Sequence, residues 1–313
     1  MSELALFGRD LFGDIIKPKA SGIVADRFTL PPFSVFDARS GAWQERKRAW
    51  RSLGIAGELG RGADLAYTGA ARSFDHYRVK EGTRATTDDR GTSLFDPVLC
   101  ELIYKWFSPA GGQVVDPFAG GSVRGLVAGA LGRNYWGCDL RKEQIKANEV
   151  QADNVPVSVR PVWLCGDSQA MLDGAPAADL VFSCPPYGSL EKYSDDPADL
   201  SAQDWPTFRW NYRRTIRKAV ACMKVNRFAC FVVGDFRDKR GNYRNFVSET
   251  ISAFLDSGCE HYNEAILLTA VGSASMRVSR QFAAGRKLAK THQNILVFIK
   301  GDGLKASKAC GVL

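Results

Sequence analysis

Short apolar, β-branched runs alternate with longer helix-like segments from about Leu94 to Lys300, and this alternation constrains the fold more than any other feature. Strands joined by helical crossovers lie parallel in one sheet that is covered on both faces. With 313 residues, 45% of them hydrophobic, the chain can bury the core of such a sheet. We therefore predict an α/β fold with a doubly wound, mainly parallel, seven-stranded sheet and helices on both faces. The predicted strands are Gln113–Asp116, Tyr135–Asp139, Val162–Asp167, Leu180–Cys184, Phe228–Asp235, Glu264–Thr269 and Asn294–Lys300.

The first 93 residues lack this alternation and form a predicted N-terminal extension. Within it, Trp43–Arg51 has the pattern of a basic, aromatic helix that ends near Gly54. Such a helix can dock through its tryptophans and leave a solvated basic face, or it can bring Arg46 and Lys47 to phosphate groups. We predict three parts: an extension at 1–93, which is a candidate DNA-contacting or target-recognition region, a core at 94–301 and a C-terminal tail at 302–313.

Charge and cysteine usage narrow the classes of protein. The formal net charge of +8 favours polyanionic partners without specifying which. No apolar run approaches the ~20 residues of a membrane span, and the N-terminus lacks the pattern of a signal peptide. Neither the eight cysteines nor the three histidines show the spacing of metal ligands, so we predict no metal site. The scattered cysteines suggest reduced thiols in a cytoplasmic protein.

A glycine-rich turn follows the first predicted strand. The segment Asp116-Pro117-Phe118-Ala119-Gly120-Gly121 leads into a helix of small residues. Glycines at this position let the backbone approach a ligand, and the helix N-terminus offers unpaired amides. Because no Lys-Ser or Lys-Thr pair follows, a phosphate-binding P-loop is disfavoured.

Acidic residues end three successive strands of the predicted sheet. Asp116, Asp139 and Asp167 would form a rim at one sheet edge, where a carboxylate can accept both hydroxyls of a ribose. Each aspartate alone could instead be a cap. In order, they suggest a nucleoside site with Asp116 near a cationic group, Asp139 on ribose and Asp167 near the base.

The segment Ser183-Cys184-Pro185-Pro186-Tyr187 ends the fourth predicted strand and carries the strongest signal. Its prolines stiffen the backbone and leave carbonyls without competing amides, and Tyr187 can stack on a flat ring. This arrangement suits a base extruded from a nucleic acid. The plainer alternative is a Pro-Pro turn with a packed tyrosine.

These motifs together resemble the S-adenosylmethionine-dependent amino-methyltransferases of DNA, in particular phage and prophage modification methylases. The resemblance rests on Asp116-Pro117-Phe118-Ala119-Gly120 and Cys184-Pro185-Pro186-Tyr187 and covers roughly residues 94–300. It implies a Rossmann-like class I methyltransferase fold with S-adenosylmethionine as cofactor. It also implies that Phe95 and Asp96, in a segment similar to the family's additional cofactor-binding segment, contact the methionine end. With Phe118, Ala119, Gly120, Gly121 and the acidic rim, they complete the expected cofactor site.

Cys184 departs from the family pattern. Relatives carry Asp, Asn or Ser there to accept a hydrogen bond from the target amine, and a thiol is a far weaker acceptor. The expected amine partners are therefore the carbonyls of Cys184 and Pro185, with Ser183 as a substitute hydroxyl. A nucleophilic role of Cys184 in pyrimidine C5 methylation is less favoured, because such enzymes place the cysteine after a proline.

Two further basic segments are candidate nucleic-acid contacts. In the predicted helix Trp205–Met223, three arginines spaced by four residues form one stripe that could follow a phosphate backbone or lie in solvent. The stretch Ala270–Thr291 lacks an obvious helix, so it is predicted as a long basic loop, with groove entry as its preferred role. Such a connection allows an antiparallel closing strand. The cations concerned are Arg209, Arg213, Arg217, Arg277, Arg280, Arg286, Lys287 and Lys290.

The sequence thus predicts a methyltransferase that modifies adenine N6 or cytosine N4 of a flipped base in duplex DNA, with a restriction-modification setting as the family context. RNA methylation and a catalytically decayed nucleic-acid-binding protein remain open alternatives. Monomer and homodimer are equally compatible with the sequence, and no membrane partner is expected.

Overall fold

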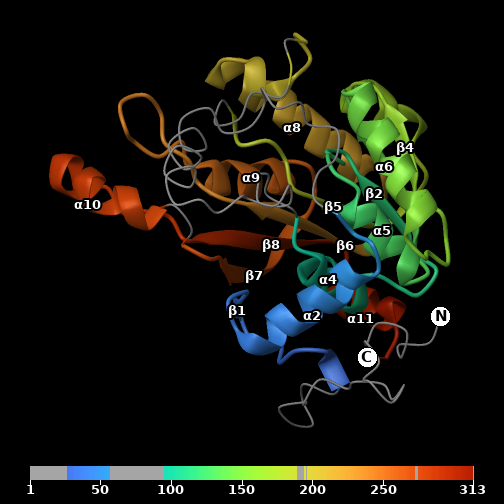
Figure 1. The fold of residues 1–313 in the computed structure, drawn as a ribbon. Helices are drawn as coiled ribbons and strands as arrows, with labels where there is room; N and C mark the ends of the chain where they lie inside the picture. Colours follow the sequence, from blue (N-terminus) through green and yellow to red (C-terminus); the bar gives the residue numbers. More distant parts are fainter. Residues whose placement is uncertain (1–26, 57–94, 189–193, 195, 272–273, 313) are drawn as a thin grey trace.

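The computed structural model describes residues 27–56, 95–188, 194, 196–271 and 274–312. One sheet of eight strands forms its centre (Figure 1). The strands are β1 (Val35–Asp37), β2 (Gln113–Asp116), β3 (Asn134–Asp139), β4 (Val162–Cys165), β5 (Ala178–Ser183), β6 (Met223–Val233), β7 (Glu260–Leu268) and β8 (His292–Lys300).

The strand order is β1-β7-β8-β6-β5-β2-β3-β4. Strands β2 to β6 pair in parallel, and β8 runs antiparallel between β6 and β7. This confirms the predicted Rossmann-like class I methyltransferase fold, and β8 is the antiparallel closing strand that the sequence allowed. The sheet has eight described strands instead of the predicted seven, because Val35–Asp37 pairs with β7 as β1. The chain builds the sheet outward from β2 to β4 and then returns to place β5 on the other side of β2. Ligands of open α/β sheets bind at such a reversal of strand order.

Two apolar cores lie on opposite faces of the sheet because side chains alternate along each strand. Val114 packs into one core with helices α2 (Gly41–Ser52), α4 (Pro97–Phe107) and α5 (Val123–Ala130). The adjacent Val115 packs into the other core with α8 (Trp205–Cys222) and α9 (Phe246–Leu255). The same alternation separates Phe182 from Val181. The apolar residues of β2 and β5 are therefore buried on both faces of the sheet, as is typical of parallel strands.

Helices cover both faces, and aspartates start several of them. Asp204 accepts a hydrogen bond from the amide of Thr207 at the start of α8, and Asp96 accepts one from Val98 at the start of α4. The helices are α2 (Gly41–Ser52), α4 (Pro97–Phe107), α5 (Val123–Ala130), α6 (Lys142–Asn154), α7 (Ser168–Met171), α8 (Trp205–Cys222), α9 (Phe246–Leu255), α10 (Ala274–Gly285) and α11 (Gly303–Cys310).

Residues 27–56 are built into the core instead of standing apart as an extension. Strand β1 pairs in parallel with β7, and Trp43 and Trp50 of α2 are each 1% exposed. Arg46 forms an ion pair with Glu101 of α4, a carboxylate that also accepts a hydrogen bond from Trp50 Nε1 at 2.8 Å. Arg46 therefore holds α2 against α4, which corrects its predicted contact with phosphate. Apart from this docked segment, the predicted extension at 1–93 lies outside the described residues.

The C-terminal segment is also part of the core. Helix α11 lies against α4 and β6, and its Ala306 is fully buried. The boundary predicted at residue 302 therefore separates no independent tail in the described part of the chain.

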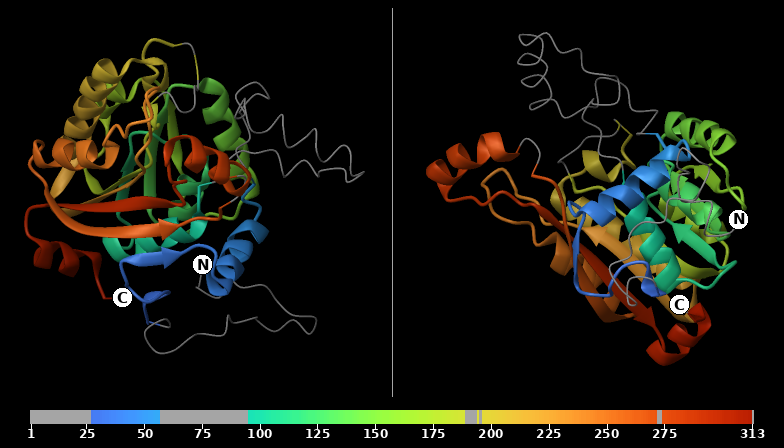
Figure 2. Two further views of the ribbon diagram at one scale, coloured as in Figure 1. Left: turned by 90° about the vertical axis from the view of Figure 1, so that its left-hand side faces the viewer. Right: turned by 60° about the horizontal axis from the view of Figure 1, so that its bottom comes forward.

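The predicted basic loop contains a helix, α10. It stands away from the sheet in Figure 1 and in the right-hand view of Figure 2. Most of its described side chains are exposed, including Met276 at 65% and Phe282 at 40%. The sequence reasoning missed this helix because its apolar side chains have no core to face, so the usual pattern of a packed helix is weak.

All eight cysteines lie in the described residues, and none of them forms a disulfide bond. Within the same residues, no helix has the length and apolar character needed to cross a membrane.

Candidate active site

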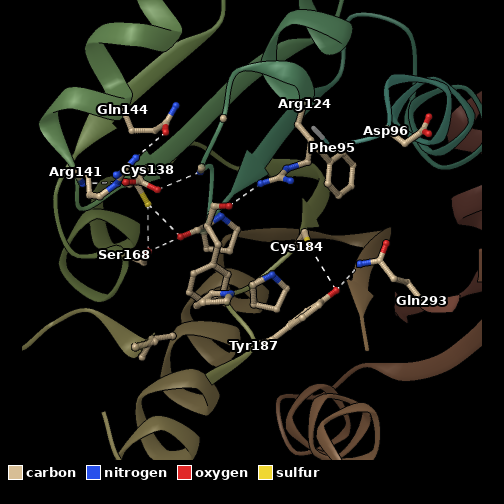
Figure 3. A pocket seen from close by; sticks show the side chains of 18 of the residues that line it. Phe95, Asp96, Arg124, Cys138, Arg141, Gln144, Ser168, Cys184, Tyr187 and Gln293 are labelled. Carbon is tan, nitrogen blue, oxygen red and sulfur yellow. Dashed lines mark hydrogen bonds between the residues drawn. The ribbon is translucent and has the colours of Figure 1, made fainter. Parts of the chain in front are cut away.

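A cavity of about 630 Å³ lies at the carboxyl ends of β2, β3, β4 and β5, where the strand order reverses (Figure 3). This volume is in the range of small-molecule sites. The cavity brings together the glycine-rich turn, two of the three acidic strand ends and the Pro-Pro-Tyr segment. The predicted site residues that line it are Phe95, Asp96, Phe118, Gly120, Gly121, Asp139, Asp167, Cys184, Pro185, Pro186 and Tyr187.

Gly120 forms the bend of the glycine-rich turn. Its φ of +50° lies in the left-handed region, and a Cβ built there would meet no atom within 4 Å. The backbone thus faces open space in the cavity. Ala119 is fully buried, and its amide donates to the carbonyl of Cys138 at 3.0 Å. Ala119 therefore supports the turn from behind instead of lining the cavity as predicted.

Asp116 lies behind the cavity and is fully buried. One carboxylate oxygen accepts hydrogen bonds from the Phe118 amide at 3.1 Å and from Ser183 Oγ at 2.6 Å. The other accepts from Arg124 Nε at 2.6 Å and from Tyr135 Oη at 2.7 Å. This saturation corrects the expectation that Asp116 faces a cationic ligand group. Ser183 is fully buried and does not line the cavity, so its hydroxyl does not face a substrate amine as predicted.

Arg124 is a cavity residue that the sequence analysis missed. Its side chain is 5% exposed, and Nη2 donates to the carbonyls of Phe118 and Ala119 at 2.6 and 2.9 Å. Burial opposes its charge, but the ion pair with Asp116 outweighs this and raises the pKa of Arg124. Its guanidinium also lies 4.6 Å from the centre of the Phe95 ring. A single arginine among the small residues of α5 was the signal for this role.

Asp139 and Asp167 line the cavity as predicted. Asp139 Oδ1 accepts from the amide of Arg141 at 2.8 Å, and Oδ2 accepts from the amide of Gly120 at 3.2 Å. These bonds fix the carboxylate and leave acceptor capacity on both oxygens. Burial raises the pKa of Asp139, whereas the two amides oppose that shift. Asp167 caps α7 through the amide of Gln169 at 3.0 Å.

The Cys-Pro-Pro-Tyr segment forms the opposite wall. The phenol oxygen of Tyr187 lies 3.8 Å from Cys184 Sγ and accepts a hydrogen bond from Gln293 Nε2 at 2.7 Å. The Tyr187 ring packs edge-on against Phe246, with ring centres 6.0 Å apart. Tyr187 is thus fixed in position while one part of it borders the cavity.

Helix α2 contributes a third wall, which the sequence did not predict. Gln44 and Lys47 line the cavity, and Lys47 Nζ forms an ion pair with Asp96 at 2.9 Å. Asp96 also accepts a hydrogen bond from Trp43 Nε1 at 3.1 Å. Lys47 therefore belongs to the cavity, which corrects its predicted role as a surface contact with phosphate.

The basic stripe on α8 is partly neutralised by α9. Arg209 and Arg213 both form ion pairs with Glu249, at 2.9 and 2.5 Å, and Arg213 also pairs with Asp256 at 2.6 Å. Arg209 and Arg217 are both exposed, and of the three arginines only Arg217 has no ion pair among the described residues. The prediction of a continuous phosphate-binding stripe is therefore wrong for Arg209 and Arg213, because their charges hold two helices together.

The sequence matches no family model and no curated protein. Solved structures with a similar backbone include TrmN from Thermus thermophilus, with a TM-score of 0.46 and 16% identity over 66% of this chain and 49% of that one. Magnesium protoporphyrin IX methyltransferase from Synechocystis PCC 6803, with bound SAM, has a TM-score of 0.43 and 11% identity over 74% and 93%. A second Thermus thermophilus protein, described as a DNA modification methylase, has a TM-score of 0.33 and 19% identity over 44% and 52%. The chain spans about half the length of the first and third proteins. The fold assignment rests on the strand order of the chain itself.

Proposed function

We propose that this chain is an S-adenosylmethionine-dependent methyltransferase that acts on an exocyclic amine, adenine N6 or cytosine N4, of a base flipped out of DNA. One observation carries the proposal: a single cavity at the reversal of strand order joins the glycine-rich turn and Asp139 to the Cys-Pro-Pro-Tyr segment. A nucleoside site and a site for a flat amine-bearing ring therefore adjoin each other, as transfer between them requires.

The residues present fit S-adenosylmethionine. Asp139 would accept the ribose hydroxyls, since its carboxylate is fixed and retains acceptor capacity, and Asp167 lies farther along the same edge toward the base. The open space above Gly120 admits a ligand close to the backbone. Arg124 places a buried cation where the carboxylate of an amino-acid group would bind. The bound cofactor would supply an electrophilic methyl group on a sulfonium sulfur.

The chain's own residues would orient the amine. The Cys184 and Pro185 carbonyls would accept hydrogen bonds from it, and Tyr187 would contact the ring face. No strong general base is needed in this arrangement, because the amine becomes acidic once it has gained the methyl group. The main contribution of the protein is alignment of the two reacting atoms.

The DNA would approach from the side of α10. This helix and the turn after it carry Arg280, Arg286 and Lys287. They lie in the connection between β7 and β8 and project beyond the ends of these strands (Figure 1). Arg280 and Arg286 are exposed and Lys287 is half-buried. Cations on a projecting segment suit contact with phosphates or entry into a groove. The +8 net charge of the chain supports a polyanionic substrate.

The proposal is tested by expressing the protein in cells that lack DNA methylation and sequencing their DNA for modified bases. We expect N6-methyladenine or N4-methylcytosine in a fixed sequence context. Methylation found only in RNA would replace DNA as the substrate, and methylation at cytosine C5 would favour the nucleophilic role of Cys184. Binding of DNA and cofactor without transfer to any base would contradict the enzymatic proposal.

The cofactor site has a separate test that does not depend on the substrate. Asp139→Ala should weaken S-adenosylmethionine binding in calorimetry by about a hundredfold, because it removes acceptors for two hydroxyls. Asp153→Ala, at an exposed residue of α6, is the matched control and should bind like the wild type. Equal affinities in both variants would contradict the assigned ribose site.

A further inference from the structure

Gln293 lines the cavity near Cys184, whose thiol is a weak hydrogen-bond acceptor. It lies near the start of β8, paired with Leu267 of β7, and it lines the cavity together with Cys184 and Tyr187. Gln293 Nε2 donates a hydrogen bond to Tyr187 Oη at 2.7 Å, and Cys184 Sγ lies within hydrogen-bond distance of the same oxygen at 3.8 Å. Two segments far apart in the chain thus converge on one hydroxyl (Figure 3).

The hydrogen bond from Gln293 Nε2 to Tyr187 Oη fixes the orientation of the Gln293 carboxamide. Because Nε2 donates to Tyr187 Oη, the phenol hydrogen can point toward Cys184 Sγ, and Gln293 Oε1 lies on the other branch of the amide. Figure 3 shows this oxygen directed away from Tyr187. No described residue donates a hydrogen bond to it. The cavity therefore contains an amide oxygen with acceptor capacity.

We propose that Gln293 Oε1 is the side-chain acceptor for the exocyclic amine of the target base. It would perform the task for which Cys184 is poorly suited, since an amide oxygen accepts far more strongly than a thiol. In this view Gln293, Tyr187 and Cys184 act as one unit, in which the phenol orients the carboxamide. The inference rests on the proposed function and specifies which residue recognises the amine.

The chemistry balances without a proton acceptor on Gln293. The amine nitrogen forms a bond to the methyl carbon while the carbon–sulfur bond breaks and sulfur keeps the electron pair. The nitrogen then loses one proton to water. Throughout, Oε1 accepts an N–H hydrogen bond, which increases electron density on the nitrogen and fixes its direction of attack.

A simpler role for Gln293 would be to hold the Tyr187 ring in place. The two roles predict different orders of effect. If Gln293 only anchors Tyr187, then Tyr187→Phe, which removes the shared hydroxyl, should be as harmful as Gln293→Leu. If Oε1 accepts the amine, Gln293→Leu should be clearly worse, and Gln293→Glu, which keeps an oxygen there, should retain most of the activity.

The experiment uses duplex DNA that carries the base and sequence found to be methylated by the wild-type protein. We expect Gln293→Leu to lower the single-turnover rate of transfer about tenfold or more, and Tyr187→Phe to lower it about threefold, with unchanged affinity for S-adenosylmethionine. Gln113→Leu is the matched control, because Gln113 is the first residue of β2 and lies at the end of that strand away from the cavity. It should keep the wild-type rate. Adding Cys184→Asn should restore activity to Gln293→Leu by supplying a new amide oxygen.

A binding measurement provides a readout apart from activity. With S-adenosylhomocysteine bound, the wild type should prefer the target duplex to one in which that base is replaced by purine or 2-pyrimidinone, which lack the amine. This preference should shrink in Gln293→Leu and persist in Tyr187→Phe. Equal rates or equal preferences for the two variants, in an active wild-type background, would overturn the acceptor role of Gln293. Absence of any transfer by the wild type would overturn the proposed function and this inference with it.

Discussion

Helices α2 and α10 both carry arginines and aromatic side chains, but they are placed differently in the fold. In α2, Trp43 and Trp50 are buried and Arg46 is bound by Glu101, so this basic segment holds two helices together. In α10, Met276 and Phe282 are exposed and the helix projects from the sheet. The difference lies in what each helix packs against. The buried carboxylate of Glu101 faces α2, whereas no helix or strand of the described residues covers α10.

The comparison shows that a run of cations does not by itself locate a polyanion. Arg209 and Arg213 of α8 are a second example, because both form ion pairs with Glu249 of α9. A carboxylate distant in sequence decides whether an arginine is structural or available. The surface left for a nucleic acid is therefore smaller than the charge distribution suggested, and it centres on α10.

The largest effect that tests this comparison is on stability. Arg46→Ala should lower the free energy of unfolding by about 3 kcal/mol, because it leaves the fully buried Glu101 without its main counter-ion. Arg280→Ala on α10 is the matched variant and should leave that free energy unchanged. Urea unfolding measures both. Similar losses in the two variants would show that α10 is also held in a folded contact.

The second effect is on nucleic-acid affinity. Here substitutions in the α10 segment should have a large effect, although they should leave stability unchanged. Replacing Arg280, Arg286 and Lys287 together by Gln should weaken DNA binding about tenfold at moderate salt. It should also flatten the slope of log affinity against log salt, by about 0.9 for each phosphate that the protein no longer neutralises. Anisotropy titrations at several salt concentrations measure this. Arg160→Gln, an exposed residue paired with Asp153, should leave the slope unaltered, and an unaltered slope in the triple variant would remove α10 from the interface.

The smallest effect sharpens the role of Glu101 through pH. Burial opposes its charge, but the bonds from Arg46, Lys105 and Trp50 outweigh this and lower its pKa below the ordinary value of 4.5. A lowered pKa contributes stability above the unfolded value that is lost as the pH falls through the folded one. Wild-type stability should therefore fall more steeply below roughly pH 4.5 than that of Glu101→Gln.

Chemical unfolding at a series of pH values tests this expectation. Glu143→Gln, at an exposed position in the first turn of α6, should follow the wild-type curve and serves as the control. Parallel curves for the wild type and Glu101→Gln would mean that the carboxylate does not stabilise the docking of α2.

Much of the fold and part of the site could be predicted from local sequence. The β-branched runs and the breaks between them predict seven of the eight strands, with identical bounds for β2 at Gln113–Asp116. They miss β1, and they begin β6 at Phe228 instead of Met223. Asp139, Gly120 and Tyr187 were found because Asp139 ends β3 and the other two lie in the turns after β2 and β5, whose carboxyl ends meet at one edge. Residues at strand ends inherit their position from the sheet, so the prediction of the sheet places them as well.

The remaining site residues could not be found in this way, because their roles depend on contacts across the chain. Gln293 has no local motif and acquires its position only when β8 closes the sheet beside Tyr187. Asp116 looked like a ligand residue, yet Arg124, Tyr135, Ser183 and the Phe118 amide saturate its carboxylate. Whether a polar group faces a ligand or the protein depends on what surrounds it in three dimensions.

The sequence by itself determined the class of fold, the order of the motifs and the edge of the sheet at which they meet, since strand periodicity and turn residues act over a few neighbours. Only the tertiary structure decided which charges remain available. Ion pairs such as Arg46 with Glu101 join residues far apart in the chain, and burial makes these pairings strongly selective because an unpaired charge in the core is costly.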